Sequence, residues 1–151
     1  MLYFVMEPAD GILLPTAPKN EKAAIVASSG LRRFCEIDYD VRSNLISERL
    51  KLVMERFMPK YDFQPVVYLD PPKNEQMIFW RWRPAAIDGY QADFRSDGIV
   101  SDISFPGEIG PLAFTVWSRK GVQSTVVRLA VAESILRRCI FGVEFTRVSE
   151  Y

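Results

Sequence analysis

The densest group of chemically capable side chains in the sequence is an alternation of tryptophan and arginine, made by Trp80, Arg81, Trp82 and Arg83. On a β-strand, alternate residues face opposite sides, so the two tryptophans would share one face and the two arginines the other. Paired guanidinium groups bind carboxylate or phosphate, and paired indoles form a stacking platform. The alternative is one core face and one solvated face. Because burying two unpaired guanidinium groups is costly, we expect the arginines to face outward.

Aspartates recur in the following stretch, at Asp88, Asp93, Asp97 and Asp102. Their spacing matches no calcium loop, and neighbouring glycines make turn capping the simpler role, so we predict no metal site. Rim carboxylates also steer a protein partner without strict ligand geometry. The candidate partner-binding set is therefore Trp80, Arg81, Trp82, Arg83, Tyr90, Asp93, Asp97 and Glu108.

The sequence contains no histidine. Nucleophile systems that use a histidine base, and HExxH zinc sites, are therefore excluded. The glycines form neither a P-loop nor a GxGxxG motif, and we expect no cofactor. The 19 basic and 19 acidic residues leave no global field for nucleic acid or an anionic membrane. These features favour a protein that is not an enzyme, while a metal-dependent enzyme using Asp88, Asp93 or Glu108 is the weaker alternative.

The two cysteines and the N-terminal residues bear on the compartment. Cys35 and Cys139 lie in segments with ordinary apolar patterns and no CxxC spacing, so we expect two buried, reduced thiols and no disulfide. The first ten residues carry no basic residue before their apolar run, and no apolar run is as long as a membrane span. We therefore expect a cytoplasmic protein with no membrane association.

The best-defined element is an amphipathic helix within residues 43–57. Its apolar positions recur at helical spacing, at Ile46, Leu50, Val53, Met54 and Phe57. Three residues are candidate N-caps, namely Ser43, Asn44 and Ser47. Pro59 predicts the end of the helix.

Short β-branched and aromatic runs surround this helix and predict strands. Residues 23–27 and 33–37 form two such runs, separated by a Ser-Ser-Gly turn, and residues 62–69 and 76–83 predict a hairpin. The remaining predicted strands are at residues 2–6, 88–94, 99–105, 113–117 and 143–148.

A second helix is predicted after Ser124, within residues 125–141, with an apolar stripe that includes Leu129 and Leu136. Gly142 is placed to be its C′ residue in a positive-φ conformation. Two helices among about seven or eight strands predict one domain over residues 1–151. Its class is α+β (mixed α/β), a largely antiparallel sheet with two main helices packed on it.

Two stretches together resemble a known group of families: ISERLKLVMERF at residues 46–57 and FGVEFTRV at residues 141–148. The pairing is similar to immunity proteins of bacterial polymorphic-toxin systems, contact-dependent or type VI secreted. In those families an apolar residue precedes "SERL" or "SDRL", and the domain ends in a "GvxF" strand. We interpret these stretches as fold residues, with Leu50, Val143 and Phe145 facing the core.

The resemblance implies a small cytoplasmic protein that binds a cognate toxin, encoded by a neighbouring gene, and neutralises it by covering or plugging its active site. These families have no catalytic residues to carry over, and their toxin contacts vary, so the resemblance assigns no contact residue. The alternative is a non-catalytic regulatory interaction domain. The sequence does not specify the oligomeric state.

Overall fold

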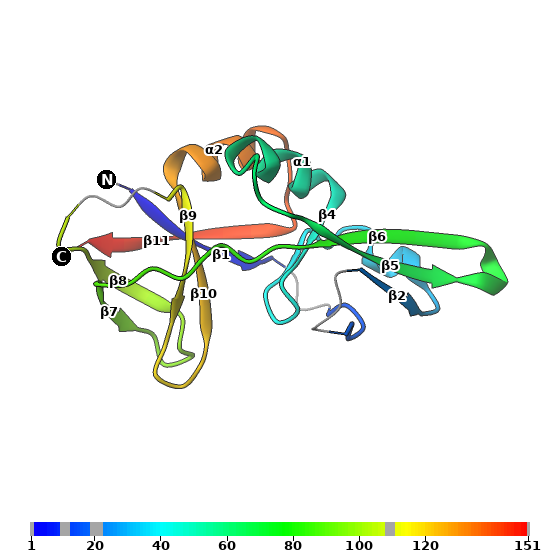
Figure 1. Ribbon diagram of the computed structural model, residues 1–151, viewed down its shortest axis with the longest axis horizontal. Coiled ribbons are helices and arrows are strands. Elements are labelled where there is room, and N and C mark those ends of the chain that lie inside the picture. The colour runs from blue at the N-terminus through cyan, green and yellow to red at the C-terminus, as the bar shows by residue number, and fades with distance from the viewer. Residues whose placement is uncertain (1, 10–12, 19–22, 108–110, 151) are drawn as a thin grey trace. The chain divides into compact units, whose positions relative to one another are not determined.

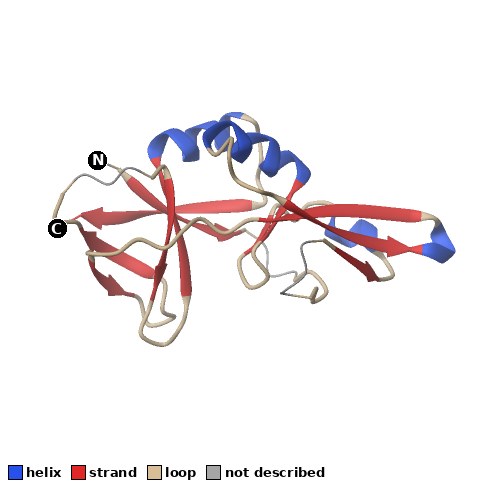
Figure 2. Ribbon diagram, viewed as in Figure 1, coloured by secondary structure: helices blue, strands red, loops and turns tan. Residues whose placement is uncertain are grey.

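The computed structural model describes residues 2–9, 13–18, 23–107 and 111–150. The chain divides into two compact units (Figure 1). Unit 1 comprises Met1–Glu7, Arg83–Arg138 and Glu144–Tyr151, and unit 2 comprises Pro8–Trp82 and Cys139–Val143. Within the described residues there are two α-helices and eleven strands, and the strands form two sheets (Figure 2). The predicted α+β class is confirmed, but the strands are divided between two mixed sheets where one sheet was expected.

Unit 1 contains a six-stranded sheet with the order β7-β8-β11-β1-β10-β9. Its core is a cluster of buried aromatic and β-branched side chains, in which Tyr3, Phe105 and Phe114 pack ring against ring at centroid distances of 5.5–5.9 Å. The elements are β1 (Tyr3–Pro8), β7 (Gln91–Phe94), β8 (Val100–Ser104), β9 (Ala113–Trp117), β10 (Gln123–Arg128), α2 (Leu129–Arg137) and β11 (Val143–Glu150).

The predicted start of the second helix was wrong. Residues 123–128 form β10, which pairs antiparallel with both β1 and β9, and α2 begins only at Leu129. The β-branched run from Thr125 to Val127 explains the difference, because such side chains are restricted in a helix and pack well on a sheet. The buried face of α2 is also shifted from the predicted stripe, since Leu136 is 51% exposed.

Unit 2 contains a five-stranded sheet with the order β2-β5-β6-β4-β3. One face packs against η1 and the segment at residues 13–18, and the buried Tyr68 donates a hydrogen bond to the Pro15 carbonyl at 2.8 Å. This burial raises the pKa of Tyr68 to about 12. The elements are β2 (Ala24–Ala27), η1 (Leu31–Phe34), β3 (Tyr39–Asp40), β4 (Leu45–Ser47), α1 (Glu48–Phe57), β5 (Gln64–Asp70), η2 (Pro71–Lys73) and β6 (Glu75–Arg81).

Helix α1 forms as the apolar periodicity predicts, but it begins later. Among the three candidate caps the structure selects Ser47, whose hydroxyl accepts a hydrogen bond from the Leu50 N–H at 3.2 Å. Leu50, Val53 and Met54 are buried, and the helix ends at Phe57, two residues before the proline. Ile46, assigned to the helical stripe, lies instead in β4.

The predicted strand at residues 33–37 is also wrong, because this stretch begins in the 3₁₀ helix η1. Gly30 adopts a left-handed conformation with φ of 64° and precedes the first turn. Leu31 and Phe34 are three residues apart, so they lie on one side of a 3₁₀ turn and are both buried in the unit 2 core. The predicted hairpin is confirmed, since β5 and β6 pair antiparallel with Val66 opposite Phe79.

Candidate partner-binding site

A buried carboxylate, Asp38, organises the most elaborate polar network described in unit 2. Its side chain is 0% exposed and lies just before β3. The Ser47 hydroxyl donates to Oδ1 at 2.6 Å, and the Gly142 backbone N–H donates to Oδ2 at 2.9 Å. Arg49 donates from Nε to Oδ1 at 2.5 Å and from Nη2 to Oδ2 at 3.0 Å. We call these four residues the Asp38 network.

The network fixes the orientation of the first turn of α1. Ser47 caps the helix with its oxygen and simultaneously donates its hydroxyl proton to Asp38. The bidentate contact then holds the Arg49 guanidinium, although that side chain is 50% exposed. The hydrogen bond from Arg49 to Asp38 raises the pKa of the guanidinium above its usual value. Arg49 therefore presents a charged group in a defined orientation at the surface of unit 2.

Glycine is required at position 142 because other backbone atoms lie too close for a side chain there, and not because of its φ angle. The expected positive φ was wrong; in this turn the residue with positive φ is Cys139, at 56°. A Cβ on Gly142 would lie 2.7 Å from both the Glu36 carbonyl oxygen and the Asp38 backbone nitrogen, and closer still to the Asp38 carboxylate. Only glycine lets this backbone approach the network.

Replacement of Gly142 by alanine is expected to lower the free energy of unfolding by about 2 kcal/mol or more, because the new methyl group meets backbone atoms that cannot rotate away. Urea denaturation followed by circular dichroism measures the change. Gly107→Ala is the matched control, since a Cβ there meets no atom within 4 Å. Equal stability of the two variants would contradict the close approach.

A partly open cavity of about 430 Å³ adjoins the Asp38 network within unit 2. Its charged wall residues are Glu36 and Arg49, and its aromatic residue is Phe141, whose side chain is 73% exposed. A backbone hydrogen bond joins two segments of its wall: the Ala9 N–H donates to the Gly142 carbonyl at 3.1 Å. The described residues that line it are Ala9, Glu36, Arg49, Cys139, Phe141 and Gly142. We call this the unit 2 pocket.

The predicted alternation at residues 80–83 holds only as far as Arg81, where β6 ends. Trp80 lies under α1, with the Lys51 ammonium 4.4 Å from its ring centroid and its indole N–H donating to Glu48. Trp82 is 1% exposed and packs edge-on against Tyr39 at a centroid distance of 6.4 Å. Both tryptophans therefore have packing roles within unit 2.

The expectation that both arginines face outward was wrong for Arg81. This side chain is partly buried on the opposite face of β6 from Trp80, and it donates to the Pro18 carbonyl. Its Nε is buried without a hydrogen-bond partner in the part of the chain that the structure describes. Arg83 belongs to unit 1 and is exposed, with its guanidinium carbon 5.9 Å from the Trp117 ring centroid. The structure therefore does not bring the two arginines together as one fork.

The other predicted contact residues belong to unit 1. Tyr90 is partly buried against the unit 1 core, and Asp93 is exposed on β7 directly opposite Asp102 on β8. Two like charges placed opposite each other weaken a strand pair, so this pair contributes nothing to the stability of the sheet. Glu108 lies outside the described residues.

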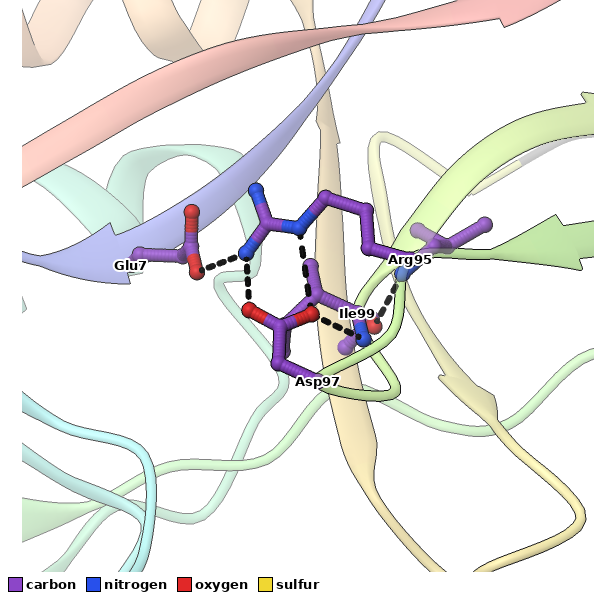
Figure 3. A network of polar contacts seen from close by, with 6 residues as sticks. Glu7, Arg95, Asp97 and Ile99 are labelled. Atoms are coloured by element: carbon purple, nitrogen blue, oxygen red, sulfur yellow. Dashed lines mark hydrogen bonds and ion pairs between the residues drawn. The ribbon is translucent and has the colours of Figure 1, made fainter.

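Asp97 has the turn-capping role that the glycine beside it indicates. Its carboxylate accepts from the Ile99 N–H at 3.1 Å and pairs with the Arg95 guanidinium at 2.7 Å. Figure 3 shows Arg95 between Asp97 and Glu7, whose carboxylate lies 3.0 Å from Arg95 Nη2. The hydrogen bond from Arg95 lowers the pKa of Asp97 below its ordinary value.

This lowered pKa predicts a pH-dependent contribution to stability. Since the folded pKa of Asp97 lies below its unfolded value of about 3.9, the ionised carboxylate stabilises the fold above that pH. The contribution is lost as the pH falls through the folded pKa. Asp97→Asn is therefore expected to be less stable than the parent at pH 6 and to match it near pH 2, in urea denaturation at both values. An unchanged difference at pH 2 would contradict the assignment.

Two further expectations concern the cysteines and metals. Both cysteines are free thiols, as predicted, but the expectation that they are buried was wrong, because both are exposed. The described residues include no group of three or more cysteine, aspartate or glutamate side chains placed to hold a metal ion. Neither described helix is long and apolar enough to cross a membrane.

Sequence reasoning missed Asp38, Arg49 and Phe141 as site residues. Arg49 lies in the "SERL" stretch, which we interpret from the sequence as fold residues, and Asp38 has no local pattern to mark it. Phe141 was the one available signal, because a large aromatic residue beside a glycine at a helix end is unusual for a surface turn. No protein-family model, curated protein or solved structure matches the chain. The fold and the site together define an α+β protein with a surface pocket, two of whose lining residues, Arg49 and Gly142, are held by hydrogen bonds to the buried Asp38.

Proposed function

We propose that this protein is an immunity protein that binds and neutralises a cognate antibacterial toxin in the cytoplasm. The observation that carries the proposal is the meeting of the two stretches behind the resemblance. Ser47 and Arg49 from the "SERL" stretch and Gly142 from the "GVEF" stretch all donate to Asp38. Two stretches that meet at one buried carboxylate form a single structural feature, which supports reading their co-occurrence as a family signature.

The character of the exposed surface gives a second line of support. Tight protein interfaces depend on a few anchors, and arginine and aromatic side chains are the commonest. Arg49 and Phe141 both line the unit 2 pocket, and the network behind Arg49 reduces the conformational entropy lost when a partner binds. A pre-oriented surface of this kind suits an inhibitor that must bind tightly. The proposal assigns no catalytic residue.

The proposal is tested with the gene's neighbourhood. An immunity gene lies beside a large toxin gene, so the C-terminal domain encoded there is produced in bacteria with and without this protein. We expect that domain alone to arrest growth, co-production to restore it, and the two proteins to elute together in size-exclusion chromatography. Growth arrest that co-production fails to relieve would reject the proposed function.

A further inference from the structure

Among the described residues that line the unit 2 pocket, one carboxylate, Glu36, has no ion pair, although Arg49 on the same wall interacts with it electrostatically. Glu36 is exposed, and no lysine or arginine nitrogen in the described ranges comes within ion-pairing distance of it. The other charged wall residue, Arg49, is paired with the buried Asp38 at 2.5 Å. Counting Glu36, Arg49 and Asp38 together gives a net charge of −1, so the pocket favours a cation over an anion.

Phe141 adds a second feature that suits a cation. Its ring lines the same pocket and is 73% exposed. An aromatic face attracts a lysine ammonium or arginine guanidinium, and arginine also stacks flat on a ring. The apolar stem of either side chain would cover the ring and remove apolar surface from water. A carboxylate in the same place would meet Glu36 as a like charge.

We infer that the unit 2 pocket is where the partner docks and that it receives a lysine or arginine side chain of the toxin. The cationic group pairs with Glu36 and lies over the ring of Phe141, while the Asp38 network holds two other lining residues, Arg49 and Gly142, in place. The inference rests on the proposed function for the identity of the partner. It moves the expected contact surface away from the strand at residues 80–83.

The test uses the full-length protein and the toxin domain encoded beside it, with affinities measured by isothermal titration calorimetry. Glu36→Lys is expected to weaken binding about 100-fold and Glu36→Gln about tenfold, because the first reverses the charge and the second removes it. Phe141→Ser is expected to weaken binding about tenfold or more. Ile25→Ser is the matched control, since Ile25 is 74% exposed on β2, and its affinity should stay within twofold.

Circular dichroism melting separates loss of binding from loss of folding, and all four variants change exposed side chains. If the parent protein protects cells while Glu36→Lys and Phe141→Ser bind within twofold of it, the docking inference is overturned and the proposed function stands. Tighter binding by Glu36→Lys would also overturn it, because the partner would then present an anion.

A measurement without the toxin covers the case in which the parent protein fails to protect. The ¹⁵N-labelled protein is titrated with Nα-acetyl-arginine amide and, separately, with Nα-acetyl-glutamine amide. Shifts of the Phe141 and Gly142 amides with the arginine probe only, which disappear in Glu36→Lys, support a cation-selective pocket. Equal shifts with both probes, or none with either, overturn the cation preference.

Discussion

Cells that produce the Leu50→Asp variant are expected to contain little or no soluble protein. Leu50 is 0% exposed on the inner face of α1, so the new carboxylate would have to be buried without a partner or be protonated. Losing the leucine side chain and burying a carboxyl group together cost about 4 kcal/mol or more. A domain with a total stability of about 5–15 kcal/mol loses much of its folded population from such a change.

Leu52→Asp is the control for this prediction. Leu52 lies on the same helix and is 50% exposed, so a carboxylate there stays in water. We expect its thermal midpoint to remain close to that of the parent, while Leu50→Asp either fails to accumulate or melts far earlier. If the Leu50 variant melted with the parent, the apolar stripe would not face a core. This comparison separates the loss of core packing from any general effect of charge on the helix.

Replacing Asp38 with alanine is expected to have the second largest effect, lowering the free energy of unfolding by about 3 kcal/mol. The substitution removes the acceptor for the Ser47 hydroxyl, for the Gly142 N–H and for two nitrogens of Arg49. The half-exposed guanidinium can return to water, whereas the Ser47 hydroxyl is in a buried position. Urea denaturation of the purified variant measures the loss.

Two companion variants test whether the network acts as a unit. Arg49→Ala alone should cost about 1 kcal/mol, because its partially exposed ion pair is screened by water. The double variant Asp38→Ala with Arg49→Ala should then be less destabilised than the sum of the two single changes, since the contacts are shared. Strict additivity would show that Asp38 and Arg49 act independently, which would contradict the bidentate contact.

The stability of the network and binding at the pocket are linked through Arg49 and Gly142, which belong to both. Arg49 is held by Asp38 and also lines the pocket, so Asp38→Ala should release the guanidinium even in molecules that remain folded. Glu36 and Phe141 belong to the pocket but donate nothing to Asp38. Variants at those two positions are therefore expected to change binding without weakening the fold, since both side chains are exposed.

The sequence by itself determined the α+β class and the elements whose signals are local. Helix α1 follows from apolar residues at helical spacing together with a serine cap and a proline beyond its end. The β5–β6 hairpin follows from two β-branched and aromatic runs joined by a polar turn. These patterns act over a few residues, so they can be recognised before any packing is known.

Local patterns failed where two structures competed for one stretch. The sequence pattern predicts one helix that includes residues 125–128. In the structure these residues pair with β1 and β9 and therefore form a strand. Similarly, the prediction for Trp82 and Arg83 assumed that the two-residue alternation of a strand continues to residue 83. Strand β6 ends at Arg81, so the alternation does not apply to these two residues. Whether a segment pairs as a strand depends on neighbours far away in the chain.

Only the tertiary structure decided the site. Gly142 and Asp38 are 104 residues apart, yet their hydrogen bond is 2.9 Å long, and no periodicity within either segment encodes that meeting. The tertiary structure buries Asp38, orients Arg49 and leaves Phe141 exposed in the pocket that Glu36 also lines. The physical reason is that a buried carboxylate is tolerated only where donors from distant segments converge on it, and that convergence exists only in the folded chain.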